Sequence, residues 1–224
     1  DVWPAGFRPQ PLRELPRAQS VALLREYVGA TGADTPDGRP DAALAAVAAA
    51  VGDLTLAGSY LAAYPDIATA AYLARLARPD LLAEIAPRPG AAFSWTRHER
   101  DVARTFAISF DGLRPDDSDT DAGALLVLAG ATQLLPGEPF PRVLATEMLP
   151  GDDPHRPDDA VNRLLALGLL ERTGGGGLRL HRLLAAFVAG AVARIDQARR
   201  EEAASAGEDD NIGLLDAAGA ALED

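Results

Sequence analysis

The sequence predicts a mainly α-helical protein, in which a bundle of four or five helices is followed by a winged helix-turn-helix domain with a short β-hairpin wing. Three observations predict this class. Apolar residues make up 48 % of the chain but aromatic residues only 5 %, and the excess of alanine and leucine favours closely packed helices over an all-β core. Apolar residues recur at helical spacing between breaks at proline or glycine. Finally, four consecutive glycines separate the short apolar runs 169–173 and 178–180, a pattern typical of a tight hairpin.

The first ninety residues are expected to form the bundle. Predicted helices cover residues 15–29, 41–51, 54–64 and 65–78, with one or two further turns at 80–86. Pro16 and Pro65 suit the first turn of a helix, Asp41 suits an N-cap, and Gly29 suits a helix end. The third helix is apolar on almost every side, so it should be buried on most sides.

A second domain is expected after the Pro- and Gly-containing stretch 87–96. Helices are predicted at 97–113, 122–135, 139–149 and 157–168, followed by the hairpin and a helix at 181–198. This order and these lengths are the layout of a winged helix-turn-helix domain. We therefore predict domains at 12–90 and 97–195, with 196–224 as a charged linker or the start of a further helical region.

Composition excludes several functions. The 21 basic residues are all arginine, against 33 acidic ones, which gives a net charge of -12 and opposes binding to a nucleic-acid backbone. With no lysine, the chain has neither a G-x-x-x-x-G-K-[ST] phosphate loop nor a Schiff-base lysine.

With no cysteine, it has no thiolate site, and a cytoplasmic location is the default expectation. No run is long and apolar enough to span a membrane, and the first ten residues do not form a signal peptide. Because the chain starts without methionine, we expect it to be a fragment of a longer protein.

His181 is the foremost candidate for a functional side chain. It follows the hairpin and begins a helix, where its ring can donate to an anion in a cleft between domains or can cap the helix. The glycines 174–177 are interpreted as a hairpin turn, because a strand separates them from the next helix. Two further histidines, His98 and His155, are interpreted as solvated surface residues. The acidic stretches 114–121 and 151–159 are interpreted as solvated loops with helix N-caps. No catalytic constellation is present, so we expect no enzymatic activity from this chain alone.

The ordered segments resemble the regulatory part of NB-ARC (AP-ATPase type) STAND signalling NTPases, especially the bacterial ones with tetratricopeptide repeats. The resemblance rests on "LRELPRAQSVALLREYVG", "AAVGDLTLAGSYLAAY", "VARTFAISFDGL", "DDAVNRLLALGLLERT" and "LRLHRLLAAFV", and it covers about residues 12–188. It implies that 12–90 is a helical lid and that the winged helix follows it. ADP or ATP, with Mg²⁺, would be held by a P-loop domain upstream in the same polypeptide. Sensor repeats would follow downstream, and activation could involve a homo-oligomer.

The resemblance also implies nucleotide contacts for three residues. His181 matches the histidine that reaches the phosphate of bound ADP in that family. Leu54 and Thr55 lie in "DLTLA", which matches a "GLPLA" turn near the adenine, but Asp53 and Thr55 replace its glycine and proline. A threonine that starts the helix in a crowded turn is the simpler interpretation of Thr55.

Three hypotheses follow. The first is a nucleotide-sensing switch module that closes over ADP. The second is a winged-helix transcriptional regulator, although helix 157–168 offers DNA only Asn162 and Arg163 beside its two aspartates. The third is a protein-interaction scaffold that keeps the fold without sensing nucleotide, which the changes at Asp53 and Thr55 favour.

Overall fold

The computed structural model describes residues 15–29, 38–78, 81, 97–149, 153 and 155–206. These residues form mainly α-helices and one two-stranded antiparallel sheet. The helices are α1 (Arg17–Val28), α2 (Asp41–Ala50), α3 (Leu54–Ala63), α4 (Thr69–Leu76), α5 (Arg97–Phe110), α6 (Asp119–Ala131), α7 (Arg142–Glu147), α8 (Arg156–Ala166) and α9 (Arg182–Ala206). The strands are β1 (Glu171–Arg172) and β2 (Leu178–Arg179). The predicted mainly helical class is therefore confirmed, whereas the winged-helix arrangement stays a prediction.

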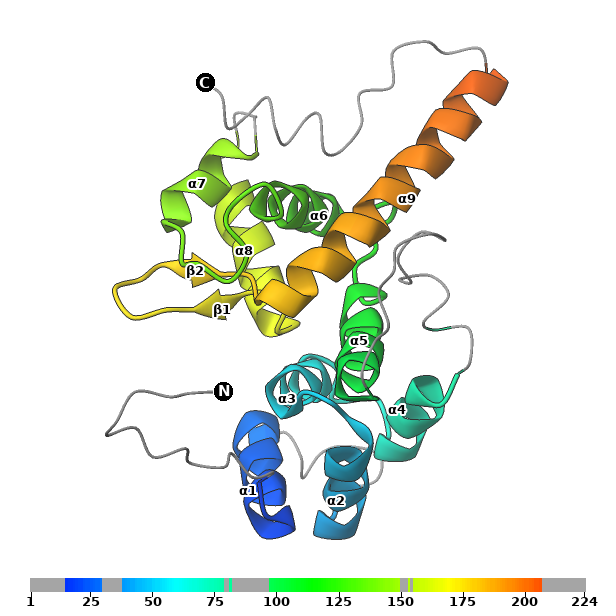
Figure 1. Cartoon of the computed structure of the whole chain (residues 1–224), viewed down its shortest axis with the longest axis vertical. Helices are drawn as coiled ribbons and strands as arrows, with labels where there is room; N and C mark the ends of the chain where they lie inside the picture. The colour runs from blue at the N-terminus through cyan, green and yellow to red at the C-terminus, as the bar shows by residue number, and fades with distance from the viewer. Residues whose placement is uncertain are drawn as a thin grey trace, which may run out of the picture.

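Helices α1 to α4 form the first half of the molecule, with α1 packed against both α3 and α2 (Figure 1). α1 ends at Gly29, whose φ of +53° suits glycine. Pro40, not Asp41, occupies the N-cap of α2, so Asp41 lies in the first turn. Helix α4 begins at Thr69 rather than at Pro65, because residues 65–67 form a turn in which the Ile67 N–H donates to the Tyr64 carbonyl at 3.2 Å. The turns predicted at 80–86 lie outside the described residues except for Leu81.

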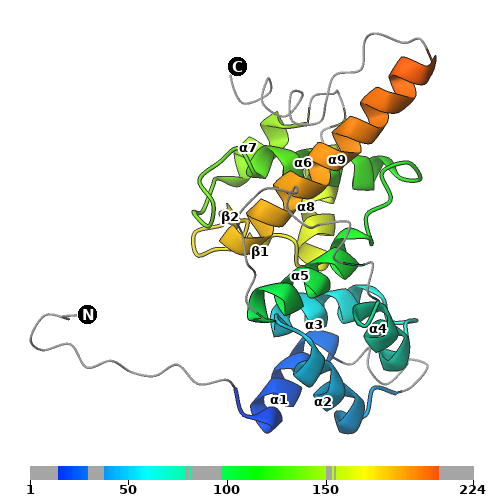
Figure 2. The ribbon, with the colours of Figure 1, turned by 45° about the vertical axis from the view of Figure 1, so that its right-hand side comes forward.

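Helices α5 to α9, the loops between them and the hairpin form the second half. α6 packs against α8 and α9, and α8 ends at Ala166 with Leu167 as its C-cap, followed by Gly168 with a φ of +71°. The predicted hairpin is confirmed, with Glu171 opposite Arg179 and Arg172 opposite Leu178. Its turn uses positive φ angles at Gly175 and Gly176. α9 runs on through the predicted boundary at residue 195 as far as Ala206, and its C-terminal end extends beyond the other helices of this half (Figures 1 and 2).

The two halves share one hydrophobic core. Buried side chains from α1 to α4 and from α5 to α9 form a single cluster, and α5 joins them because it contacts α3, α4 and α9. A Cβ at Gly52 would lie 2.2 Å from the Val102 backbone nitrogen, and one at Gly168 would lie 3.0 Å from Ser59 Cβ. The absence of side chains at these glycines therefore lets the halves approach closely.

Within the described residues, no helix is long and apolar enough to cross a membrane.

Candidate functional site

His181 lies between β2 and α9, where its half-buried ring caps the helix. The Leu183 backbone N–H donates to His181 Nδ1 at 3.3 Å, and the His181 carbonyl accepts from the Ala185 N–H at 3.0 Å. Because Nδ1 accepts a hydrogen bond, the neutral ring carries its proton on Nε2. The capping interpretation of His181 is thus observed. It is compatible with a second role, because Nε2 remains a donor.

Thr55 and Leu54 lie in the first turn of α3, which is capped by Asp53. One carboxylate oxygen of Asp53 accepts from the Thr55 N–H at 2.9 Å, the Thr55 hydroxyl at 2.7 Å and the Leu56 N–H at 3.1 Å. Leu54 is half-buried and packs against the hydrophobic core. Thr55 is therefore a residue of the first helical turn that donates to the N-cap Asp53. Asp53 gives this turn an N-cap.

A cleft of about 470 Å³ lies beside Thr55, between α1 and α3 on one side and α8 and β1 on the other. Its lining residues are Tyr27, Thr55, Ser59, Leu165, Gly168, Leu170, Glu171 and Arg172. Neither His181 nor Leu54 is among the described residues that line it. The cleft therefore joins Thr55 to the hairpin of the second half, but it does not bring the predicted nucleotide contacts together.

The polar groups of this cleft carry charges of both signs. Glu171 pairs with Arg179 at 2.5 Å, and Arg172 donates to the Asn162 side-chain oxygen at 3.4 Å. Burial raises the pKa of the Tyr27 phenol, and the carboxylates of Asp53, Glu171 and Glu26 raise it further. Tyr27 is therefore a neutral hydroxyl at physiological pH, with an acidic surrounding.

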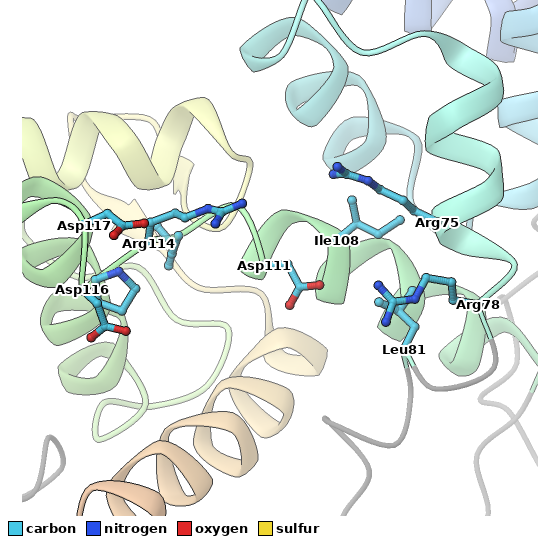
Figure 3. A pocket seen from close by; sticks show the side chains of 10 residues that line it. Arg75, Arg78, Leu81, Ile108, Asp111, Arg114, Asp116 and Asp117 are labelled. Carbon is cyan, nitrogen blue, oxygen red and sulfur yellow. The ribbon is translucent and has the colours of Figure 1, made fainter.

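A second cavity, of about 450 Å³, lies between α4, the end of α5 and the loop that leads to α6 (Figure 3). Three arginines and three aspartates line it together with apolar side chains; the charged residues are Arg75, Arg78, Arg114, Asp111, Asp116 and Asp117. The Arg75 guanidinium donates to the Tyr60 hydroxyl at 2.7 Å. Because the charges balance, the cavity favours neither an anion nor a cation. This cavity was not predicted from the sequence. The available signals were the spacing of Arg75 and Arg78, three residues apart, and the separate acidic stretch 114–121.

A hydrogen-bonded cluster, which we call the junction cluster, joins the two halves and consists of Tyr64, Gly112, Asp121 and Arg163. Arg163 Nε donates to Asp121 Oδ1 at 2.7 Å, and its Nη2 donates to the Gly112 carbonyl at 2.8 Å and to the Tyr64 hydroxyl at 2.9 Å. The Tyr64 hydroxyl donates in turn to the Gly112 carbonyl at 3.0 Å. Burial lowers the pKa of the Arg163 guanidinium, but the hydrogen bonds to Asp121 and Tyr64 outweigh this effect and raise it.

The junction cluster corrects one expectation from the sequence. Asp121 belongs to an acidic stretch that was expected to be solvated, yet it is only 5 % exposed and also accepts from the Arg114 backbone N–H at 2.9 Å. Arg163 on α8 lies opposite it and compensates its buried charge. The same pairing turns Arg163 toward the interior of the protein, away from any surface that α8 would present to DNA.

The described residues contain no group of three or more histidine, cysteine or acidic side chains that could hold a metal ion.

In comparisons with known proteins, no family matches the chain and no curated protein matches it. The candidate site therefore rests on geometry alone. His181 and its orientation carry the functional argument, because it is the predicted contact whose donor atom is left over after the local structure is satisfied.

Proposed function

We propose that this chain is the regulatory part of a STAND signal-transduction NTPase, and that its two halves close as a lid and a winged helix over ADP bound to an upstream P-loop domain. The observation that carries the proposal is the ring of His181. Its Nδ1 is used by the α9 cap, so Nε2–H is the atom that can donate to a phosphate oxygen. The positive end of the α9 dipole favours an anion at the same place.

The charges near His181 are consistent with an anionic ligand. The segment 171–182 carries Arg172, Arg179 and Arg182 against the single carboxylate of Glu171, in a chain whose net charge is -12. A local excess of positive charge in an acidic protein attracts phosphate to one place and leaves the remaining surface repulsive. Differential contact with ADP and ATP at this place would bias two arrangements of the domains.

The proposal is tested on a polypeptide that extends upstream of Asp1 and includes a G-x-x-x-x-G-K-[ST] loop. His181→Ser keeps an N-cap side chain but lacks the imidazole donor. Because a hydrogen bond to a charged group contributes about 1.5–3 kcal/mol, we expect ADP to bind about 10- to 100-fold more weakly. Calorimetric titration with ADP measures this effect, and thermal unfolding checks that the fold is kept.

A matched control is Arg25→Gln, which removes an arginine outside the segment 171–182 and leaves the α9 cap intact, so ADP affinity is expected to stay that of wild type. ADP affinity that is equal in wild type and His181→Ser contradicts the proposal, and so does an upstream region without a phosphate loop.

A second candidate function has one observation in its favour. The Asp53 cap fills the turn where an adenine would be expected to pack, which suits an interaction scaffold that does not sense nucleotide. That alternative predicts no ADP binding by the extended wild-type protein, so the same titration separates the two.

A further inference from the structure

The junction cluster contains two kinds of contact, one inside the second half and one between the halves. Asp121, Arg163 and Gly112 all lie between α5 and the end of α8, and they bond to one another without any help from the first half. Asp121 also accepts from the Arg114 N–H at 2.9 Å. This part of the cluster is therefore assembled within the second half.

Tyr64 is the contribution of the first half. Its hydroxyl accepts from Arg163 Nη2 at 2.9 Å and donates to the Gly112 carbonyl at 3.0 Å. The guanidinium and the carbonyl thus present one donor and one acceptor, already bonded to each other at 2.8 Å, to a single phenol. We propose that the Tyr64 hydroxyl is a detachable contact that sets the relative placement of the two halves.

The energetics of the cluster favour detachment over local unfolding. If Tyr64 leaves, Arg163 keeps Asp121 and Gly112, and the buried Asp121 carboxylate keeps Arg163 and the Arg114 N–H. No buried charge is therefore left without a partner. An unpaired buried charge is what makes the loss of one partner of a buried ion pair costly. Tyr64 and Arg163 are both partly exposed, so water can take over the hydrogen bonds that each has lost.

The rest of the boundary limits what Tyr64 has to hold. Near Tyr64, Leu56 and Ser59 on α3 face Gly168, which follows α8. Because a glycine has no side chain, this contact by itself does not fix the angle between the two backbones. The two hydrogen bonds of the Tyr64 hydroxyl are directional contacts between the halves, and they therefore help to fix the angle at which the apolar surfaces meet. This device is independent of any nucleotide.

The test uses the absence of cysteine from the chain, which allows two spin labels to be placed without background. One label is introduced at the exposed Ala46 on α2 and the other at Val143 on α7, which is 57 % exposed. The distribution of label-to-label distances is measured along a urea series that stops below global unfolding, and circular dichroism follows the helices in parallel.

In wild type, a longer-distance component is expected to grow with urea before helicity is lost. Tyr64→Phe removes two hydrogen bonds and should raise the longer component about ten-fold at a given urea concentration. Gly112→Ala acts from the other side, because its Cβ would lie 2.7 Å from the Tyr64 hydroxyl, and it should have the same effect. Tyr60→Phe is the matched control, since the Tyr60 hydroxyl bonds to Arg75 inside the first half, and it should leave the distances unchanged.

Three results would each overturn the proposal. The first is a distance distribution in Tyr64→Phe and Gly112→Ala identical to that of wild type. The second is an equal shift in Tyr60→Phe. The third is the loss of helicity together with any change of distance in every variant, which would mean that the halves do not separate as folded units.

Discussion

The two halves of the molecule bury their polar groups in different ways. The first half holds all four tyrosines of the chain, and three of them pack together, with ring centroids of Tyr60 4.7 Å from Tyr64 and 5.5 Å from Tyr72. It also buries Arg39 completely. The second half has no tyrosine and instead pairs Arg163 with the buried carboxylate of Asp121.

The two arginines show what this difference means. Arg39 donates to the carbonyls of Leu61, Tyr64, Pro65 and Ile67, at distances from 2.7 to 3.4 Å. These carbonyls come from the end of α3 and the following turn, where a helix leaves its acceptors unsatisfied and its dipole is negative. A buried guanidinium is therefore stabilised by several peptide dipoles in one half, whereas in the other half one carboxylate supplies the opposite charge beside two neutral acceptors. The first arrangement depends little on any single acceptor, whereas in the second the neutralisation of charge depends on Asp121.

The largest expected effect is that of Arg39→Met, which removes the donor from four carbonyls at once. We expect a loss of about 3–5 kcal/mol in the free energy of unfolding, because buried acceptors lose a charged partner. Urea denaturation followed by circular dichroism measures it. Arg25→Met is a control on a more exposed arginine of the same half, where about 0.5 kcal/mol is expected. Equal losses in both variants would contradict the importance of Arg39.

Asp121→Asn tests the single carboxylate of the second half. It leaves the Arg163 guanidinium without its charged partner, and we expect a loss of about 2–3 kcal/mol in the free energy of unfolding. Asp119→Asn is the control, since Asp119 is exposed in the same first turn of α6 and should cost about 0.5 kcal/mol. A loss in Asp121→Asn no larger than in Asp119→Asn would show that the pair contributes little.

Tyr72 links the comparison to pH. Burial raises the pKa of the Tyr72 phenol far above its usual value of 10.0, and among the described residues its buried hydroxyl has no hydrogen-bond partner. Because the pKa of Tyr72 is higher in the folded protein than in the unfolded chain, its contribution to the free energy of unfolding is constant below pH 10 and falls as the pH rises above that value. The unfolded chain can ionise there and the folded one cannot.

Tyr72→Phe should therefore raise the free energy of unfolding by about 1 kcal/mol near neutral pH, because it removes an unsatisfied hydroxyl. It should also flatten the alkaline loss of stability. Tyr27→Phe serves as a control on a more exposed phenol. Urea denaturation at pH 7 and above pH 10 measures both effects. A destabilised Tyr72→Phe would mean that its hydroxyl is satisfied after all.

The smallest effects are expected at the helix caps. Asp53→Ala removes an oxygen that accepts three hydrogen bonds and should cost about 1 kcal/mol. Ser118→Ala in the second half removes a single acceptor, to which the Asp121 N–H donates at 3.3 Å, and should cost about 0.5 kcal/mol. Thermal unfolding of the two variants compares them directly. The reverse order would show that the number of capping bonds does not determine the loss.

The sequence predicted the elements of the fold better than it predicted their polar interior. Helical periodicity, the stop at Gly29 and the glycine turn of the hairpin are local signals, and each appears in the structure where expected. The start of α4 was wrong because residues 65–67 form a turn whose carbonyls bind Arg39. That arginine comes from a loop 26 residues earlier than Pro65, and no local pattern reports such a contact.

The candidate site shows the same division. The capping role of His181 follows from its position after a strand, and Asp53 and Thr55 have the composition of an N-cap. The junction cluster could not be predicted, because Arg163 and Asp121 are 42 residues apart. In addition, charged side chains on helices are usually exposed to solvent. The burial of Asp121 depends on how closely α6 and α8 pack, which is a property of the assembled core.

The length of α9 has a mechanical consequence. A continuous helix of 25 residues is about 37 Å long, and its base is fixed beside the hairpin by the His181 cap. A tilt of about 10° at that base would displace the far end by about 6 Å over a helix of this length. The same tilt would displace residues near the base, which pack against the core, by much less than it displaces Ala206.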